Sequence, residues 1–294
     1  MRVFVTGATG FVGAAVADEL LAAGHQVLGL ARSDAAAAAL AARGIAVHRG
    51  ALDDLDSLRR GAESAEAVVH TAFIHDFSKF RENCEIDRGA IGAFTAALAG
   101  SRRPLIVTSG TGLLPGRIAT EDDVPPKPAA NPRVATEEAA AEAAARGVHV
   151  VIVRLPQVHG DGDHAFVPLL INLAREKGVS AYVGDGFNRW PAVHRFDAAR
   201  LYRLVLEKGT RLRYHAVAEE GISLRDIAEV IGRRLDVPVV GKTGEDAANH
   251  FGWFSHFASA DMPASSAKTR AELRWEPTGP SLIPDIDRDR YFER

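Results

Sequence analysis

The chain has 294 residues, of which 47% are hydrophobic and 25% charged, with one cysteine, Cys84, and a formal charge of −3 at pH 7. This composition excludes the disordered and fibrous classes, and a lone cysteine excludes a disulfide framework and a cysteine-rich metal site. The balanced charge predicts no nucleic-acid partner, and no apolar run reaches the roughly 18 residues of a membrane span. Because a strand is predicted from residue 2 onwards, there is no room for a signal peptide, and a cytoplasmic protein is expected.

The N-terminal half alternates short β-branched runs with longer helical stretches. The expected strands are 2–5, 26–30, 46–49, 67–70, 105–108 and 148–154, and the expected helices are 13–23, 34–43, 55–61, 87–99 and 136–146. Continuous apolar strands that alternate with helices indicate a parallel sheet covered on both faces. We therefore predict an α/β fold, a Rossmann-type doubly wound parallel sheet, with residues 1–155 as its nucleotide-binding domain.

After residue 155 this alternation is lost, and glycines interrupt shorter elements. Helices are still expected at 197–207 and 223–234, the second capped by Ser223, and a strand at 214–217. We predict that residues 156–294 form mainly a smaller C-terminal substrate-binding lobe, with elements near 192–218 returning to the first sheet.

A glycine-rich segment follows the first strand and opens the first helix. In such a turn one glycine allows a tight bend, one lets the backbone approach a pyrophosphate, and one lets helix and strand pack closely, while the helix N-terminus offers free N–H groups. A position between the first strand and first helix makes this signal specific. The segment predicts cofactor contacts from Thr6, Gly7, Thr9, Gly10, Phe11, Val12 and Gly13.

The end of the second strand indicates which dinucleotide is bound. Proteins that bind NAD place an acidic residue here to accept hydrogen bonds from the ribose 2′-hydroxyl, whereas this chain has Arg32 and Ser33. A guanidinium can grip a 2′-phosphate with two hydrogen bonds, and a serine can add another. NADP(H) is therefore the expected cofactor. The alternative is that Arg32 is a solvated surface residue with no role in binding.

These motifs together resemble the extended and atypical short-chain dehydrogenase/reductases, also called the NAD-dependent epimerase/dehydratase family. The resemblance covers nearly the whole chain and is carried, beyond TGATGFVG, by the segments 50–54 (GALDD), 70–73 (HTAF), 107–112 (VTSGTG), 154–160 (RLPQVHG), 192–197 (AVHRFD, like the family's VHVDD), 265–268 (SSAK) and 273–277 (LRWEP).

The resemblance implies roles for residues in these segments. Cofactor contacts are implied for Leu52, Thr71, Ala72, Phe73, Pro156 and Val158. Ser109 and Thr111 match the fifth strand, which carries the family's catalytic Ser or Thr, and would orient the substrate. Substrate contacts are expected from His75, His164, Trp190 and His194. A purely structural role is the alternative for Trp190 and His194, and a solvated loop is the alternative for His164.

The family's Tyr-x-x-x-Lys signature is absent. In the family the Tyr donates a proton to the substrate oxygen, and the Lys lowers its pKa and holds the nicotinamide ribose. Arg133 and Glu137 occupy these two positions, and no Tyr occurs before Tyr182. Arginine stays protonated at neutral pH and cannot act as the proton donor. As the alternative to a catalytic role, Arg133 and Glu137 form a surface ion pair at i, i+4.

Three functions are compatible with this substitution. The first is an NADPH-dependent reductase of a small organic carbonyl or imine that obtains its proton elsewhere; an iminium substrate would need no proton donor. The second is a non-catalytic NADP(H)-binding redox sensor or scaffold. The third is an epimerase or dehydratase, which is the least expected without the Tyr. We predict the first, because a sensor would not require a full-length substrate lobe.

The proton source remains open at this point. By its pKa histidine is the obvious donor, and His159 is a catalytic candidate, with packing of its turn as the alternative. Further candidates are His75, Asp76, His164, Tyr182 and His194. Asp161, Asp163 and His164 lack further ligands at metal-binding spacing, so no metal is expected. A small-molecule substrate is the expected partner, and a homodimer is compatible with the family.

Overall fold

The computed structural model describes residues 1–113, 116–126 and 131–293. Its central element is a parallel sheet in the order β10-β6-β5-β4-β1-β2-β3. The strands are β1 (Arg2–Thr6), β2 (Gln26–Ala31), β3 (Ala46–Arg49), β4 (Ala67–His70), β5 (Leu105–Gly110), β6 (Val150–Leu155) and β10 (Arg213–His215). The predicted doubly wound Rossmann-type sheet is confirmed.

Alternating side chains of β1 show how the sheet is covered. Val3 and Val5 are buried with one set of helices, whereas Phe4 is buried with the other set. The first face carries α1 (Phe11–Ala22), α2 (Asp34–Ala42), α7 (Arg195–Lys208) and α11 (Ala267–Leu273); the second carries α3 (Leu55–Glu63), α4 (Phe80–Leu98) and α5 (Val134–Ala145). Because successive side chains of a strand point to opposite faces of the sheet, the core is divided into two layers.

The strand order reverses between β1 and β4. From β1 the chain first adds β2 and β3 on one side and then returns to add β4, β5 and β6 on the other. The loops that follow β1 and β4 therefore leave the same edge in opposite directions. Ligands of open α/β sheets bind at such a reversal, outside the carboxyl ends of the strands.

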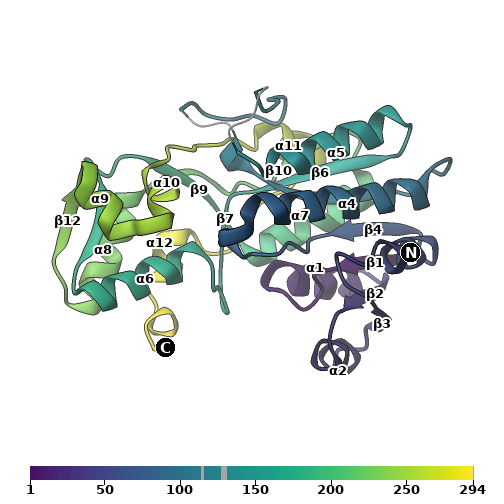
Figure 1. Ribbon diagram of the computed structural model, residues 1–294, viewed down its shortest axis with the longest axis horizontal. Helices are drawn as coiled ribbons and strands as arrows, with labels where there is room; N and C mark the ends of the chain where they lie inside the picture. Colours follow the sequence, from purple (N-terminus) through teal and green to yellow (C-terminus); the bar gives the residue numbers. More distant parts are fainter. Residues whose placement is uncertain (114–115, 127–130, 294) are drawn as a thin grey trace.

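A smaller lobe lies beside this sheet (Figure 1). It contains a three-stranded sheet of β7 (Gln157–His159), β9 (Arg189–His194) and β11 (Glu219–Ser223), and a parallel pair of β8 (Ser180–Val183) and β12 (Val239–Lys242). Its helices are α6 (Phe166–Lys177), α8 (Leu224–Leu235), α9 (Gly244–Phe251), α10 (Ser255–Ser259) and α12 (Leu282–Ile286). The 3-10 turns are η1 (Phe77–Lys79), η2 (Thr111–Leu113), η3 (Gly252–Phe254) and η4 (Asp289–Tyr291).

Elements between residues 192 and 218 divide between the two parts. α7 packs beside α1, and β10 joins the edge of the large sheet next to β6. β9 pairs instead with β7 and β11. Residues 192–194 therefore belong to the lobe, whereas we predicted that they return to the large sheet. Among the described residues no helix combines the length and hydrophobicity needed to cross a membrane.

Most element boundaries agree with the sequence-based expectations within two or three residues, but α4 begins seven residues earlier than predicted, at Phe80. The extra turns are stabilised by tertiary contacts that the local pattern does not contain. The Phe80 ring packs 6.2 Å from that of Phe73 and 5.6 Å from that of Phe77. Just before the helix, Asp76 caps η1 through the Ser78 N–H.

Candidate active site

The glycine-rich loop lies at the reversal between β1 and β4. Gly7 has a φ of +72°, which favours glycine, and a Cβ there would lie 2.8 Å from the backbone nitrogen of Ala72. A Cβ on Gly13 would lie 2.1 Å from the Gly7 carbonyl oxygen. Only glycine fits at these two positions, because any side chain would separate the loop from α1 and from the segment after β4.

The N-terminus of α1 is left open to an anion. Its capping residue Gly10 provides no side-chain acceptor, and the first turn holds no acidic residue. The first N–H groups of a helix need an acceptor, and the helix dipole favours a negative one. Thr9 and Gly10 are exposed and Phe11 and Val12 partly so, which leaves this end accessible. The loop therefore fits the pyrophosphate of a dinucleotide.

Thr6 is the exception among the predicted contacts of this loop. It is fully buried, and its hydroxyl lies 2.7 Å from His70 Nδ1 and accepts a hydrogen bond from the Ala72 N–H. Thr71 donates from its side chain to the Thr6 carbonyl oxygen over 2.7 Å. The structure thus assigns Thr6 and Thr71 to holding the β1 and β4 loops together.

The end of β2 presents an unpaired arginine. Arg32 is exposed and makes no ion pair or hydrogen bond with any other described residue. Its neighbour Ser33 caps α2 by accepting from the Ala36 N–H at 3.2 Å, and this hydroxyl still has a proton to donate. The nearby Arg49, by contrast, is bound to Asp34. Arg32 is therefore the cation that is free to bind a ligand here.

Arg133, assigned from the sequence to the position of the family's Tyr, lies just before α5. Its Nη1 donates to Asp87 Oδ2 at 2.7 Å and to the Thr136 hydroxyl, and its Nη2 donates to the Thr108 carbonyl oxygen at 2.8 Å. The guanidinium carbon lies 4.1 Å from the centre of the Phe73 ring. These contacts use three of the five N–H groups of the guanidinium. The cation is thus fixed in place with two N–H groups left over.

A buried chain of polar groups connects Arg133 with the glycine-rich loop. Asp87 Oδ1 lies 3.0 Å from His70 Nε2, and His70 in turn contacts Thr6. Burial acts to raise the pKa of Asp87, but the charge of Arg133 and the hydrogen bonds of His70 and Thr136 outweigh it, and the pKa lies below its usual range. Asp87 is therefore an anion that balances Arg133.

Glu137 belongs to a different cluster. Its side chain is buried and accepts hydrogen bonds from Arg154 at 2.6 Å, Arg213 at 3.1 Å and Ser109 at 3.2 Å. Burial would raise its pKa, but the two arginines hold the pKa below its usual value. The alternative of a surface ion pair between Arg133 and Glu137 is wrong, because the two side chains bind different partners. Glu137 instead fastens α5 to β6 and β10.

Ser109 and Thr111, predicted to orient the substrate, are each only 4% exposed. The Ser109 hydroxyl is engaged with Glu137, and Thr111 begins the buried turn η2. Thr108 carries the third hydroxyl of this segment, and it bonds to the Tyr202 hydroxyl at 2.6 Å and to the His70 carbonyl oxygen at 2.8 Å. The hydroxyls of β5 are thus turned into the protein, and the assignment of Ser109 and Thr111 to substrate remains a prediction.

His75 and His164 come together near the glycine-rich loop. The His75 ring lies 5.3 Å from that of Phe73, and the His164 ring lies 6.0 Å from that of Phe11. Both histidines are exposed. Desolvation by the surrounding protein, followed by the charges of Arg133 and His164, lowers the pKa of His75. His75 is therefore an accessible neutral imidazole beside Arg133.

Three other predicted residues are placed differently. His159 is fully buried with Nδ1 2.8 Å from Asp285 Oδ2, so its enclosure argues against direct proton transfer to a substrate. Trp190 is 1% exposed and packs in the core of the lobe. His194 is 7% exposed and caps α7 through the Phe196 N–H. Asp285 thus holds His159 and core packing holds Trp190, and the catalytic and substrate assignments of these residues stay predictions.

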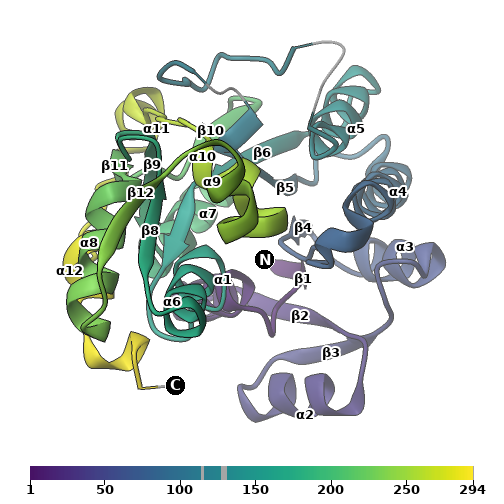
Figure 2. The ribbon, with the colours of Figure 1, turned by 60° about the vertical axis from the view of Figure 1, so that its left-hand side comes forward.

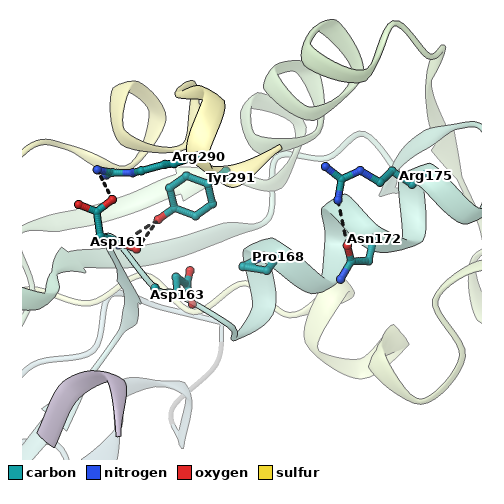
Figure 3. Close-up of a pocket in the computed structure, with 9 residues that line it drawn as sticks. Asp161, Asp163, Pro168, Asn172, Arg175, Arg290 and Tyr291 are labelled. Carbon is teal, nitrogen blue, oxygen red and sulfur yellow. Dashed lines mark hydrogen bonds and ion pairs between the residues drawn. The ribbon is translucent and has the colours of Figure 1, made fainter. Parts of the chain in front are cut away.

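A hollow of about 100 Å³ lies beside the turn that follows β7 (Figure 3). It is lined by Gly160, Asp161, Gly162, Asp163, Pro168, Asn172, Arg175, Arg290 and Tyr291. Its charged groups are already engaged: Arg290 binds Asp161, and Arg175 donates to Asn172. Tyr291 donates to the Gly160 carbonyl oxygen and accepts from its N–H. This hollow contains none of the predicted site residues.

Sequence reasoning missed Asp87, His70 and Tyr202. Asp87 lies 46 residues before Arg133, within a helix whose local pattern does not indicate a buried charge. One signal was present: a lone buried aspartate on the apolar face of α4, which also carries Cys84, Ile91 and Phe94. A charged residue on such a face requires a partner of opposite charge.

Comparison with known proteins identifies the family to which the chain belongs. An uncharacterized protein of Schizosaccharomyces pombe is 50% identical over 99% of this chain and 100% of its own length. Another from Saccharomyces cerevisiae is 48% identical over 97% of this chain and 98% of its own. The solved structure of DesIV, a dTDP-glucose 4,6-dehydratase of Streptomyces venezuelae with NAD bound, superposes with a TM-score of 0.78 at 21% identity. The match covers all of this chain and 97% of the DesIV chain. Residues 3–217 match the NAD dependent epimerase/dehydratase family, and the chain belongs to that family.

Proposed function

We propose that this protein is an NADP(H)-dependent oxidoreductase that reduces a small organic carbonyl or imine. The observation that carries the proposal is that Asp87 and Thr108 hold the Arg133 cation in place. By sequence, Arg133 is assigned to the position of the family's proton-donating Tyr. A guanidinium cannot release its proton at neutral pH, but its N–H groups stabilise negative charge on an oxygen. We therefore assign the role of polarising the substrate to Arg133.

A bound nicotinamide would supply the hydride. The residues of this chain that would hold the dinucleotide are the glycines of the β1–α1 loop, whose fit to a pyrophosphate rests on the missing side chains at Gly7 and Gly13 and on the uncapped helix. Arg32 is assigned to the 2′-phosphate, because this exposed guanidinium binds no other described residue. This last contact distinguishes NADP(H) from NAD(H).

The proton for a carbonyl substrate is assigned to His75. It is the accessible histidine whose pKa is lowered by desolvation and by Arg133, so its charged form is disfavoured beside that cation. Because the pKa is lowered, only a minor fraction of His75 is protonated at pH 7, and this protonated fraction is the general acid. Tyr202 cannot take the role, because it is fully buried and burial raises its pKa. An iminium substrate would need no proton.

A direct test is to titrate the protein with NADPH and NADH by nucleotide fluorescence and then to follow NADPH oxidation with ketones, aldehydes and cyclic imines. The proposal predicts tighter binding of NADPH and oxidation with at least one class. Tight binding without oxidation across all three classes would contradict it and support the redox-sensor alternative. Conversion of a nucleotide sugar without net NADPH oxidation would support an epimerase or dehydratase instead.

A further inference from the structure

Arg195 occupies an unusual position at the start of α7. It follows His194 in the segment 192–197, where the family's VHVDD has a valine. α7 packs beside α1, which brings Arg195 next to Phe11, the first residue of α1 (Figure 2 shows the two helices together). An arginine in place of a small apolar residue therefore stands beside the open end of the helix that follows the glycine-rich loop.

Two aromatic rings hold the guanidinium. Its carbon lies 5.4 Å from the centre of the Phe11 ring and 4.7 Å from that of Phe196. The stem is fixed as well, because a Cβ on Gly160 would lie 3.2 Å from Arg195 Cγ. Contacts with aromatic rings stabilise the positive charge of the guanidinium. Because the side chain is already held in place, it loses less conformational entropy when it binds a ligand.

No anion in the described part of the chain balances this cation. Among the residues that the structure describes, none forms an ion pair or hydrogen bond with the Arg195 side chain, and its Nε is enclosed without an acceptor. Acidic residues near Arg195 in the sequence or in the adjoining turn are engaged elsewhere: Asp197 binds Arg200 at 2.6 Å, and Asp161 binds Arg290. Asp163, in the same turn, accepts from the Ala165 N–H at 2.8 Å. The partly exposed guanidinium therefore finds no acceptor among the described residues, and a ligand anion would supply one.

We propose that Arg195 binds the pyrophosphate of the cofactor, opposite the N–H groups of the β1–α1 loop. This inference rests on the proposed binding of NADP(H). The guanidinium fork matches two phosphate oxygens, and Phe11 lies both in the first turn of α1 and beside the guanidinium. The loop and Arg195 then contact the same diphosphate from α1 and from α7.

The test compares ligands with and without a pyrophosphate. Dissociation constants for NADPH and for adenosine 2′-monophosphate are measured with the wild type, R195Q and R195K. R225Q is the matched control, because Arg225 also lies over an aromatic ring, that of Tyr182, but on α8 of the lobe. Thermal unfolding of each variant verifies that it is folded.

R195Q is expected to weaken NADPH binding by roughly tenfold or more, as expected for a lost hydrogen bond to a charged group. R195Q should bind adenosine 2′-monophosphate as tightly as the wild type does. R225Q should bind both ligands with unchanged affinity, and R195K should retain most of its affinity for NADPH. An R195Q affinity for NADPH within twofold of wild type would overturn the inference while the proposed function stands. Equal weakening of both ligands would also overturn it. Failure of the wild type to bind either dinucleotide would overturn the proposed function together with the inference.

Discussion

The guanidinium of Arg133 lies 2.7 Å from the carboxylate of Asp87, and this buried ion pair joins the start of α5 to α4, while Arg133 also donates to the Thr108 carbonyl oxygen of β5. Only 2% of the Asp87 side chain and 15% of the Arg133 side chain are exposed. The pair therefore stabilises the fold only while both partners are present, because either charge alone would be buried without compensation.

The first prediction concerns this ion pair. D87N and R133Q should each lower the free energy of unfolding by about 3–5 kcal/mol, the usual cost of an uncompensated buried charge. The double variant should lose clearly less than the sum of the two, since it leaves no lone charge. Urea unfolding of the four proteins provides the measurement. Additive losses would show that the two side chains do not stabilise each other.

The contrast between Arg133 and the glycine-rich loop shows what a sequence can predict. The loop is a contiguous segment whose spacing reflects one turn of backbone, so Gly7 and Gly13 could be recognised directly. Arg133 and Glu137 are also close in sequence, yet their partners come from β5, α4, β6 and β10, up to 76 residues away. Such long-range pairs leave no periodic pattern, and for this reason the local ion-pair alternative was wrong.

The second prediction concerns Glu137, assigned from the sequence to the position of the family's Lys. E137Q should destabilise the protein by about 3 kcal/mol, because it leaves Arg154 and Arg213 without their carboxylate. E137K should destabilise it further, since it adds a third positive charge. Denaturant unfolding measures both. An E137K protein as stable as the wild type would contradict the structural role of this residue and would allow the family's motif to be restored.

The third prediction concerns cofactor choice. R32D should reduce the preference for NADPH over NADH by about tenfold or more, because it replaces a cation with an anion at the 2′-phosphate. R49S is the control, since Arg49 is nearby but bound to Asp34. The ratio of the two dissociation constants is the readout. An unchanged ratio in R32D would contradict the assignment of Arg32 to the 2′-phosphate.

The fourth prediction concerns pH. In the folded protein His215 Nδ1 donates to the Ser265 carbonyl oxygen, and Nε2 lies 3.2 Å from Arg154, where it accepts. Burial and then the charge of Arg154 lower its pKa to about 4. An unfolded histidine titrates near pH ~6.5, so between pH 6.5 and 4 the unfolded state binds more protons and stability falls as the pH falls.

This dependence should become shallower in H215N, which has no group that titrates in this range. His250, whose pKa burial also lowers to about 4, would retain part of it. Urea unfolding at several values between pH 4.5 and 7.5 compares the two proteins. Identical slopes would show that His215 is not held neutral in the folded state.

The central claim is that Arg133 polarises the substrate, and the most direct measurement is kcat for R133Q with a carbonyl substrate and with a permanently charged iminium. Only the carbonyl develops negative charge on its oxygen. With NADPH affinity unchanged, the account predicts a loss of about 100-fold or more with the carbonyl, a loss of only a few-fold with the iminium, and partial retention of carbonyl reduction in R133K. An undiminished rate with the carbonyl, or an equal loss with both substrates, would contradict it.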